Sequence, residues 1–226
     1  MYTRAICFYP DTKPYLRDMN YHFIAIEGNI GVGKTTLAQK LAAHYHAKLI
    51  LEQFAHNPFL PKFYEDKERY AFPLELSFLA DRYEQLKDIL LSPSFHEEYI
   101  IADYTITKSQ LFARNNLEDD EYDLFIKMAD IMNTTLPKPD LLIYLHAPVS
   151  KLQQQIQQRG RPYEQNIEDT YLEAISAAYG QYLSRQELKV LMIDTAAIDL
   201  NQAVHFERLI RFLESDSTPG THKWSN

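Results

Sequence analysis

The sequence lacks the features that mark secreted and membrane proteins. Its 226 residues include one cysteine, Cys7, so no disulfide can form within the chain, which is typical of a reducing compartment. No apolar run approaches the roughly 18 residues that a membrane-spanning helix needs. The N-terminus has neither the apolar core nor the small-residue cleavage site of a signal peptide. We therefore expect a cytoplasmic protein that makes no membrane contact.

Positive charge is also scarce. Lys and Arg number 23 against 31 Asp and Glu, which gives a formal net charge of −8 with neutral histidines. Basic residues are scattered, and their densest group is Arg159-Gly160-Arg161. A nucleic-acid-binding protein would carry a basic face or stripe. We therefore expect a small-molecule ligand and no nucleic acid, and any phosphorylated ligand would need positive charge concentrated at one site.

Short apolar runs that alternate with helical patterns make up most of the chain. Its length suits one domain with at most a small lid. Strands are predicted at 23–26, 49–51, 99–102, 141–145 and 190–193, and helices at 34–45, 72–90, 105–115, 120–134, 149–158, 168–183 and 200–214. Strands that are apolar at almost every position are buried on both faces. The pattern therefore predicts an α/β fold, with a five-stranded parallel sheet flanked by helices.

The two ends of the chain depart from this pattern. Residues 1–18 contain two prolines and no clear periodicity, so we expect an N-terminal extension that need not be ordered. Met19 precedes the first predicted strand and is a candidate alternative start. Residues 215–226 are rich in Ser, Thr, Gly and Pro, which predicts a flexible tail. The domain itself is therefore expected at 19–214, with a lid at about 159–167.

Residues 28–35, with the sequence Gly-Asn-Ile-Gly-Val-Gly-Lys-Thr, match the phosphate-loop pattern G-x-x-x-x-G-K-[ST] in full. Backbone N–H groups of such a loop cradle phosphate oxygens, and the following helix adds its positive end. A chance match in a chain of this length has a probability on the order of 1%. We expect Lys34 to reach the β- and γ-phosphates of ATP and Thr35 to bind Mg²⁺. The expected ATP-binding residues are Gly28, Asn29, Ile30, Gly31, Val32, Gly33, Lys34, Thr35 and Thr36.

Three acidic residues follow predicted strands. Asp103, after the third strand, could hold the metal together with Thr35, and Asp194, after the fifth, is its rival. Only the acid on the strand beside the phosphate-loop strand can reach the metal, and in this order the third strand is the usual neighbour. Either could instead cap its strand. Glu52 follows the second strand, at the edge where parallel sheets bind ligands, and could accept a proton from an attacking hydroxyl. A solvated turn residue is the more frequent role for such a position.

Two further pairs of charged residues are candidates for ligand binding. Arg159 and Arg161 flank a glycine, which suits a mobile loop that closes over transferring phosphate, although such a pair is more often solvated surface. Glu75 and Arg82 share one face of the predicted 72–90 helix. A structural ion pair is the common alternative to ligand binding there.

Together these motifs resemble the deoxynucleoside kinases, particularly the bacterial deoxyguanosine/deoxyadenosine kinases, from about Tyr21 to about Glu214. The resemblance implies a P-loop NTPase fold, a homodimer, and phosphoryl transfer from ATP–Mg²⁺ to the 5′-hydroxyl of a purine deoxynucleoside. The implied roles are Glu52 as the general base, Tyr64 and Glu164 at the sugar 3′-hydroxyl, Arg82 on the base-binding helix, and Arg159 and Arg161 on the phosphates.

Two positions depart from that family's pattern. Asp103-Tyr104-Thr105 stands where the family has Glu-Arg-Ser or Asp-Arg-Thr, so a tyrosine replaces an arginine that positions the acceptor. Glu75 stands where relatives commonly have glutamine. A carboxylate only accepts hydrogen bonds. Guanine offers two adjacent donors on its pairing edge, whereas adenine offers one donor and one acceptor. We therefore expect deoxyguanosine to be preferred over deoxyadenosine.

Two alternatives remain open. A nucleoside monophosphate kinase would need an arginine near the acceptor phosphate, and Arg69 is available in sequence for that role. A nucleotide-binding regulatory protein without catalysis is suggested by Tyr104 alone.

Overall fold

Six parallel strands form one sheet in the computed structural model, which describes residues 19–54, 57–96, 98–185, 187–215 and 220–224. The strands follow the order β2-β3-β1-β4-β5-β6 across the sheet. Their bounds are β1 Phe23–Gly28, β2 Lys48–Ile50, β3 Ile100–Ala102, β4 Leu141–His146, β5 Val190–Asp194 and β6 Thr221–Trp224. The helices are α1 Lys34–Tyr45, α2 Leu60–Glu65, α3 Lys67–Leu90, α4 Thr107–Asn116, α5 Asp119–Asn133, α6 Val149–Arg159, α7 Asp169–Leu183 and α8 Ala203–Ser215.

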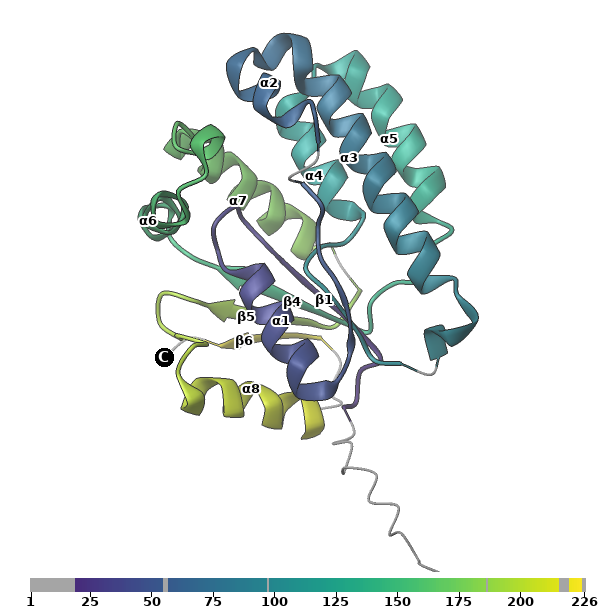
Figure 1. Cartoon of the computed structure of the whole chain (residues 1–226), viewed down its shortest axis with the longest axis vertical. Coiled ribbons are helices and arrows are strands. Elements are labelled where there is room, and N and C mark those ends of the chain that lie inside the picture. The colour runs from purple at the N-terminus through teal and green to yellow at the C-terminus, as the bar shows by residue number, and fades with distance from the viewer. Residues whose placement is uncertain (1–18, 55–56, 97, 186, 216–219, 225–226) are drawn as a thin grey trace, which may run out of the picture.

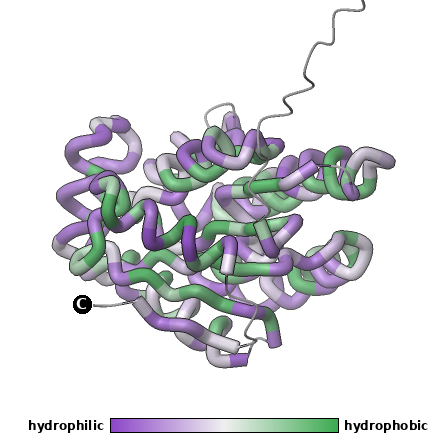
Figure 2. Tube along the Cα trace, turned by 90° about the horizontal axis from the view of Figure 1, so that it is seen from below, coloured by the Kyte–Doolittle hydropathy of each residue, from purple (hydrophilic) through white to green (hydrophobic). Residues whose placement is uncertain are grey.

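Helices cover both faces of this sheet, because alternate side chains of each strand point to opposite sides. Ile24 and Ile26 of β1 belong to a core shared with α1, α6 and α8, whereas Phe23 and Ala25 belong to a core shared with α3, α4, α5 and α7. Figure 1 shows the two groups of helices on either side of the sheet. Figure 2 shows apolar colour along the sheet and mixed colour along the helices that cover it. The predicted three-layer α/β arrangement is therefore confirmed.

The sixth strand corrects the expected count of five. β6 lies within residues 215–226, which we expected to form a flexible tail, and it pairs in parallel with β5. The expectation was wrong for these four residues because an edge strand has only partial cover and carries no apolar run. Trp224 packs edge-on against Phe212 of α8, with the ring centroids 5.4 Å apart. Residues 1–18, including Cys7, lie outside the described residues.

The helix α3 is longer at its N-terminus than predicted. It begins at Lys67 instead of residue 72, and the Asp66 side chain caps it by accepting a hydrogen bond from the backbone N–H of Arg69 at 3.2 Å. The short helix α2 before it was not predicted, because a segment of six residues carries too little periodicity to detect. None of the described helices has the length and apolar character needed to cross a membrane.

The parallel topology places the ends of three neighbouring strands at one edge of the sheet. β1 pairs with β3 on one side and with β4 on the other, and β3 pairs with β2. The phosphate loop follows β1, Glu52 follows β2, and Asp103 follows β3. Residues far apart in sequence therefore meet beyond the carboxyl ends of these strands, where open α/β sheets bind their ligands.

Candidate active site

The loop after β1 has the backbone shape that phosphate binding requires. Gly28 has a φ of 147°, and a Cβ there would lie 2.5 Å from the Leu145 carbonyl oxygen, so no other residue fits without a shift of backbone. Lys34 Nζ donates hydrogen bonds to the carbonyl oxygens of Gly28 and Asn29, both at 2.8 Å. Burial, followed by the nearby charge of Lys108, lowers the pKa of Lys34 to about 8. An anionic phosphate would therefore relieve the electrostatic cost of burying this ammonium.

Asn29 ties the loop to the helix α7. Its side-chain amide donates to the Leu172 carbonyl oxygen at 2.7 Å and to Ser176 Oγ at 2.8 Å, and its Oδ1 accepts from the backbone N–H of Ile30 at 2.7 Å. The loop is therefore held in shape by the protein itself and needs little reordering to receive phosphate.

Asp103 is the acid that meets the phosphate loop. Thr35 Oγ1 donates to Asp103 Oδ2 at 2.6 Å, whereas Asp194 lies on β5, two strands from β1, and accepts from the backbone N–H of Ala196. A hydroxyl and a carboxylate are oxygen ligands that suit Mg²⁺, which keeps several waters and shares phosphate oxygens. No group of three or more His, Cys, Asp or Glu among the described residues could hold a metal alone. The pair therefore fits a metal that arrives with a nucleotide.

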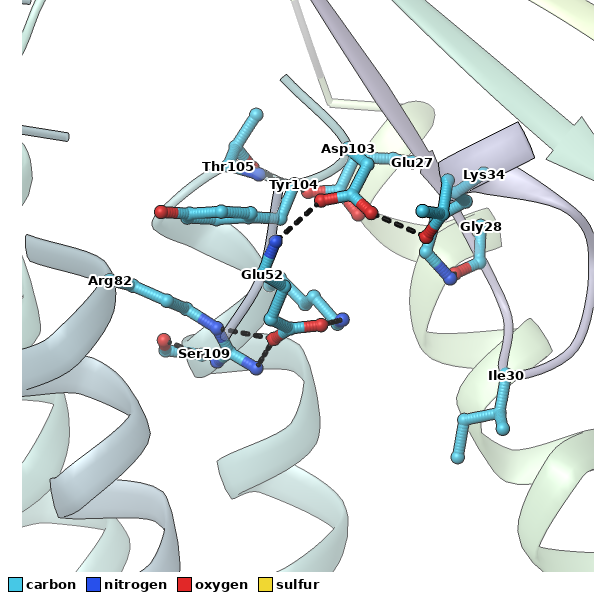
Figure 3. Close-up of polar contacts among 12 residues, drawn as sticks. Glu27, Gly28, Ile30, Lys34, Glu52, Arg82, Asp103, Tyr104, Thr105 and Ser109 are labelled. Atoms are coloured by element: carbon cyan, nitrogen blue, oxygen red, sulfur yellow. Dashed lines mark hydrogen bonds and ion pairs between the residues drawn. The ribbon is translucent and has the colours of Figure 1, made fainter. Parts of the chain in front are cut away.

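Glu52 is fixed between two cations and is not a solvated turn residue. Its Oε1 accepts from Arg82 Nε at 2.9 Å and from Arg82 Nη2 at 2.5 Å, and its Oε2 forms an ion pair with Lys108 Nζ. Figure 3 shows Arg82 facing Glu52, with Asp103 between Glu52 and the phosphate loop. Burial alone would raise the pKa of Glu52, but Lys108 and Arg82 hold it well below its usual range. The side chain is therefore an ionised acceptor aimed into the site.

Glu75 and Arg82 do share a face of α3, but each has a different partner. Arg82 pairs with Glu52, and Glu75 Oε1 accepts from Asn116 Nδ2 at 2.6 Å. Glu75 Oε2 is buried and has no hydrogen-bond partner among the described residues. Burial raises the pKa of Glu75 to about 7, against the opposing effect of Arg82 and Asn116. A buried acceptor without a partner is costly, which makes this oxygen a candidate for ligand recognition.

The loop after α6 brings its two arginines over the same pocket. Arg159 forms an ion pair with Glu164 Oε2, and Arg161 Nη1 lies 3.2 Å from Glu164 Oε1. The guanidinium of Arg161 also stacks on Phe54, 3.9 Å from the ring centroid. In this arrangement Glu164 is engaged by the two arginines, although the resemblance assigned it to the sugar. Tyr64 lies in the same pocket, and its ring stacks on Tyr163.

One pocket therefore contains most of the predicted site residues. Its lining includes Ile30, Gly31, Lys34, Thr35, Glu52, Tyr64, Glu75, Arg82, Asp103, Arg159, Arg161 and Glu164. Arg69, the candidate for an acceptor phosphate, is exposed on α3, stacks on Tyr70 and is not part of this lining.

Sequence analysis missed three polar residues of the site, of which Glu27 and Lys108 are buried and Asn116 is half-buried. Lys108 and Asn116 line the pocket from α4, and Glu27 on β1 accepts hydrogen bonds from the Thr105 backbone N–H and hydroxyl and from the Tyr179 hydroxyl. Lys108, Phe112 and Asn116 recur every four residues and so share one helix face. That spacing was a usable signal, whereas Glu27 lies in an apolar strand with nothing local to mark it.

The comparison that decides the family is a match to the deoxynucleoside kinase model over residues 24–215. The chain belongs to this family. It is 38% identical to the deoxyguanosine kinase of Bacillus subtilis, over 83% of this chain and 93% of that one. It is 33% identical to the deoxyadenosine/deoxycytidine kinase of the same organism, over 71% of this chain and 76% of that one. The protein is accordingly a deoxynucleoside kinase, a phosphotransferase.

A solved structure has the same fold. The deoxyadenosine kinase from M. mycoides with bound dCTP matches this kinase with a TM-score of 0.74, covering 85% of this chain and 99% of that one. The two are 23% identical, so this likeness concerns the fold.

Proposed function

We propose that this kinase transfers the γ-phosphoryl group of ATP to the 5′-hydroxyl of a purine deoxynucleoside and prefers deoxyguanosine to deoxyadenosine. The observation that carries the proposal is the joint placement of the phosphate loop, the ionised Glu52 and the buried Glu75 around one pocket. The first two serve phosphoryl transfer, and the third serves recognition of the base. The relatives named above are a deoxyguanosine kinase and a deoxyadenosine/deoxycytidine kinase, so their names include both purines and one pyrimidine.

The preference rests on the hydrogen-bonding capacity of Glu75. Ionised, this carboxylate presents only acceptors, one of them already bound to Asn116 and the other without a partner. The N1–H and 2-amino groups of guanine are two adjacent donors that would satisfy it. Adenine would place its N1 acceptor against a carboxylate oxygen, and mismatched buried polar groups cost on the order of a few kcal/mol.

The proposed reaction is direct in-line transfer with no covalent intermediate. Glu52 accepts the proton of the 5′-hydroxyl, Lys34 and the loop N–H groups bind the β- and γ-phosphates, and Arg159 and Arg161 turn from Glu164 to the phosphates. Thr35 and Asp103 would hold Mg²⁺, which supplies charge stabilisation at the phosphate oxygens. Glu164, once released by the arginines, is free to pair with Tyr64 at the sugar 3′-hydroxyl.

We also infer a cytoplasmic location from the single cysteine. We infer a homodimer from the family resemblance. The net charge of −8 favours a small-molecule acceptor over nucleic acid. Light scattering after size-exclusion chromatography would give the mass directly. A value near the monomer mass of 26.5 kDa would contradict the dimer.

The test is ADP release from MgATP with each of the four deoxynucleosides and with deoxyguanosine monophosphate as the control acceptor. Turnover with a purine deoxynucleoside, fastest with deoxyguanosine, is the expected result. Turnover with the monophosphate alone would indicate a monophosphate kinase, and binding of ATP without turnover would indicate a regulatory protein.

The role of Glu75 is tested with Glu75→Gln, because an amide offers one donor and one acceptor. We expect the ratio of kcat/KM for deoxyguanosine to that for deoxyadenosine to fall about tenfold or more. Glu84→Gln is the matched control, because Glu84 is exposed on the same helix. An unchanged ratio in Glu75→Gln would remove Glu75 from base recognition.

A further inference from the structure

Lys108 is a buried ammonium that no motif assigns. It lies in the first turn of α4, its side chain is 8% exposed, and it forms an ion pair with Glu52 Oε2. Arg82 binds the other oxygen, Oε1, through two nitrogens. Glu52 therefore has two cationic partners for one negative charge, and Arg82 alone would suffice to neutralise it. Burying a second cation is costly, so its presence calls for a purpose beyond this pair.

Tyr104 cannot supply positive charge to the site. It is fully buried, and its hydroxyl donates to Gln85 Oε1 at 2.5 Å, while Gln85 Nε2 donates to the Leu51 carbonyl oxygen at 3.1 Å. Figure 3 shows the Tyr104 ring directed away from Lys34 and the phosphate loop. Lys108, four residues later on α4, instead brings a positive charge to Glu52.

Lys108 also acts on the phosphate loop. Its charge contributes to the lowered pKa of Lys34, second only to burial. Both line the pocket that contains Thr35 and Asp103. A phosphate anion between Lys34 and Lys108 would remove their mutual repulsion.

We propose that Lys108 supplies the charge that Tyr104 does not carry: it positions Glu52 in the free enzyme and then moves to the transferred phosphoryl group. This inference rests on the proposed function. In the reaction, the 5′-oxygen bonds to the γ-phosphorus, the bond from that phosphorus to the bridging oxygen breaks, ADP leaves with its electron pair, and the hydroxyl proton passes to Glu52. Glu52 thereby loses its negative charge, so Lys108 loses its partner. The phosphoryl oxygens are the anions then nearest to it.

The variant that tests this is Lys108→Met, which keeps the apolar stem and removes the charge. We expect kcat to fall about 100-fold or more, as for the loss of a donor to a transition-state charge, while KM for MgATP and for deoxyguanosine changes less than about threefold. Lys108→Arg, which keeps the charge, is expected to retain at least about one tenth of kcat. Lys127→Met is the control, because Lys127 is exposed on α5, and it should behave as the wild type.

A second readout separates this role from a structural one. That readout is the split between kcat and KM: a loss confined to kcat in Lys108→Met, largely restored in Lys108→Arg, reports a charge that is used in the transition state. A residue that merely anchors α4 would lower the stability of Lys108→Met and leave the kcat of the folded enzyme near the wild-type value.

Thermal unfolding establishes that each variant is folded before kinetics are compared. A folded Lys108→Met enzyme with wild-type kcat overturns the inference and leaves the proposed function intact. If Lys108→Met does not fold, Lys108→Gln takes its place with the same expectations. Failure of both to fold makes Lys108 a folding residue and overturns the inference. Wild-type enzyme that turns over no deoxynucleoside would instead contradict the proposed function itself.

Discussion

At the scale of single residues, the site depends on two carboxylates with opposite surroundings. Glu52 lies between Arg82 and Lys108, which keep its pKa below the usual range. Glu75 is buried and accepts a hydrogen bond from the Asn116 amide, and burial raises its pKa to about 7. Carboxylates whose environments separate their pKa values commonly serve different functions in one active site. We assign proton acceptance to the first and base recognition to the second.

Replacement of Glu52 by glutamine should abolish most turnover. The amide preserves the shape of the side chain but cannot accept the hydroxyl proton, so we expect kcat to fall by about 10² to 10⁴. ATP affinity, measured by titration calorimetry, should change little because the phosphate loop is untouched. Glu173→Gln on the exposed side of α7 is the control. Near-wild-type kcat would show that Glu52 is not the base.

The preference between purines should depend on pH through Glu75. Above a pH of about 7 the ionised group accepts two hydrogen bonds, as guanine requires. Below it, the protonated group offers one donor and one acceptor, as adenine requires. Other groups that act on Glu75 are Arg82, Lys108, Glu52, Tyr64 and Tyr171.

The measurable quantity is kcat/KM for each purine deoxynucleoside between pH 6 and pH 8. The deoxyguanosine to deoxyadenosine ratio should rise about tenfold or more over this range, since each pH unit away from a pKa is a factor of ten in protonation. The dependence of this ratio on pH should disappear in Glu75→Gln. A ratio that is flat with pH in the wild type would contradict the assignment.

At the scale of elements, the phosphate loop and α7 contain glycines with opposite tolerance. Gly28 has positive φ and a carbonyl oxygen 2.5 Å from the site of a Cβ, whereas Gly180, within the exposed face of α7, has nothing within 4 Å. A methyl group at Gly28 must therefore displace the backbone of β4 or the loop. A methyl group at Gly180 only reduces the conformational freedom of the unfolded chain.

We therefore expect opposite effects of alanine at these two positions. Gly28→Ala should lower the free energy of unfolding by more than about 1 kcal/mol and weaken ATP binding strongly. Gly180→Ala should raise the free energy of unfolding by about 0.5–1 kcal/mol and leave kinetics unchanged. Urea unfolding measures the free energy of unfolding of each variant, and ATP titration measures its affinity for ATP. Equal stability of the two variants would contradict the geometry of the loop.

At the scale of the whole molecule, β6 completes one edge of the sheet. It covers β5, and Trp224 is held between the Phe212 ring and the Arg208 guanidinium, which lies 4.8 Å from the Trp224 centroid. An uncovered β5 would present unpaired backbone groups to solvent and to other chains. β6 is therefore part of the folded domain, although it lies at the edge of the sheet away from the phosphate loop.

Trp224→Ala should accordingly destabilise the fold without changing the chemistry. Because the side chain is only half-buried, we expect a loss of about 1–2 kcal/mol, below the values for fully buried aromatics, and a fall in Tm of several degrees. kcat/KM should match the wild type at a temperature well below the transition. An unchanged Tm would mean that the contacts of Trp224 with Phe212 and Arg208 contribute nothing to stability.

The sequence by itself determined the layered fold and the place of the phosphate loop in it. The strands that form the inner sheet are apolar on both faces, and the phosphate loop is contiguous, so periodicity and a local motif suffice to predict them. The five predicted strands are all present. β6 could not be predicted in the same way, because what defines it is its partner β5 and not its own four residues.

Only the tertiary structure decided which acids and cations meet. Asp103 and Asp194 both follow apolar strands, and the strand order alone puts Asp103 beside Thr35. Glu52 resembled a solvated turn residue until Arg82 and Lys108 were found on its two oxygens. Burial and charge pairing depend on contacts between segments far apart in the chain, and spacing along one segment does not encode them. The residues that we expect to bind the acceptor nucleoside depend on such contacts, and so does the role we propose for Lys108.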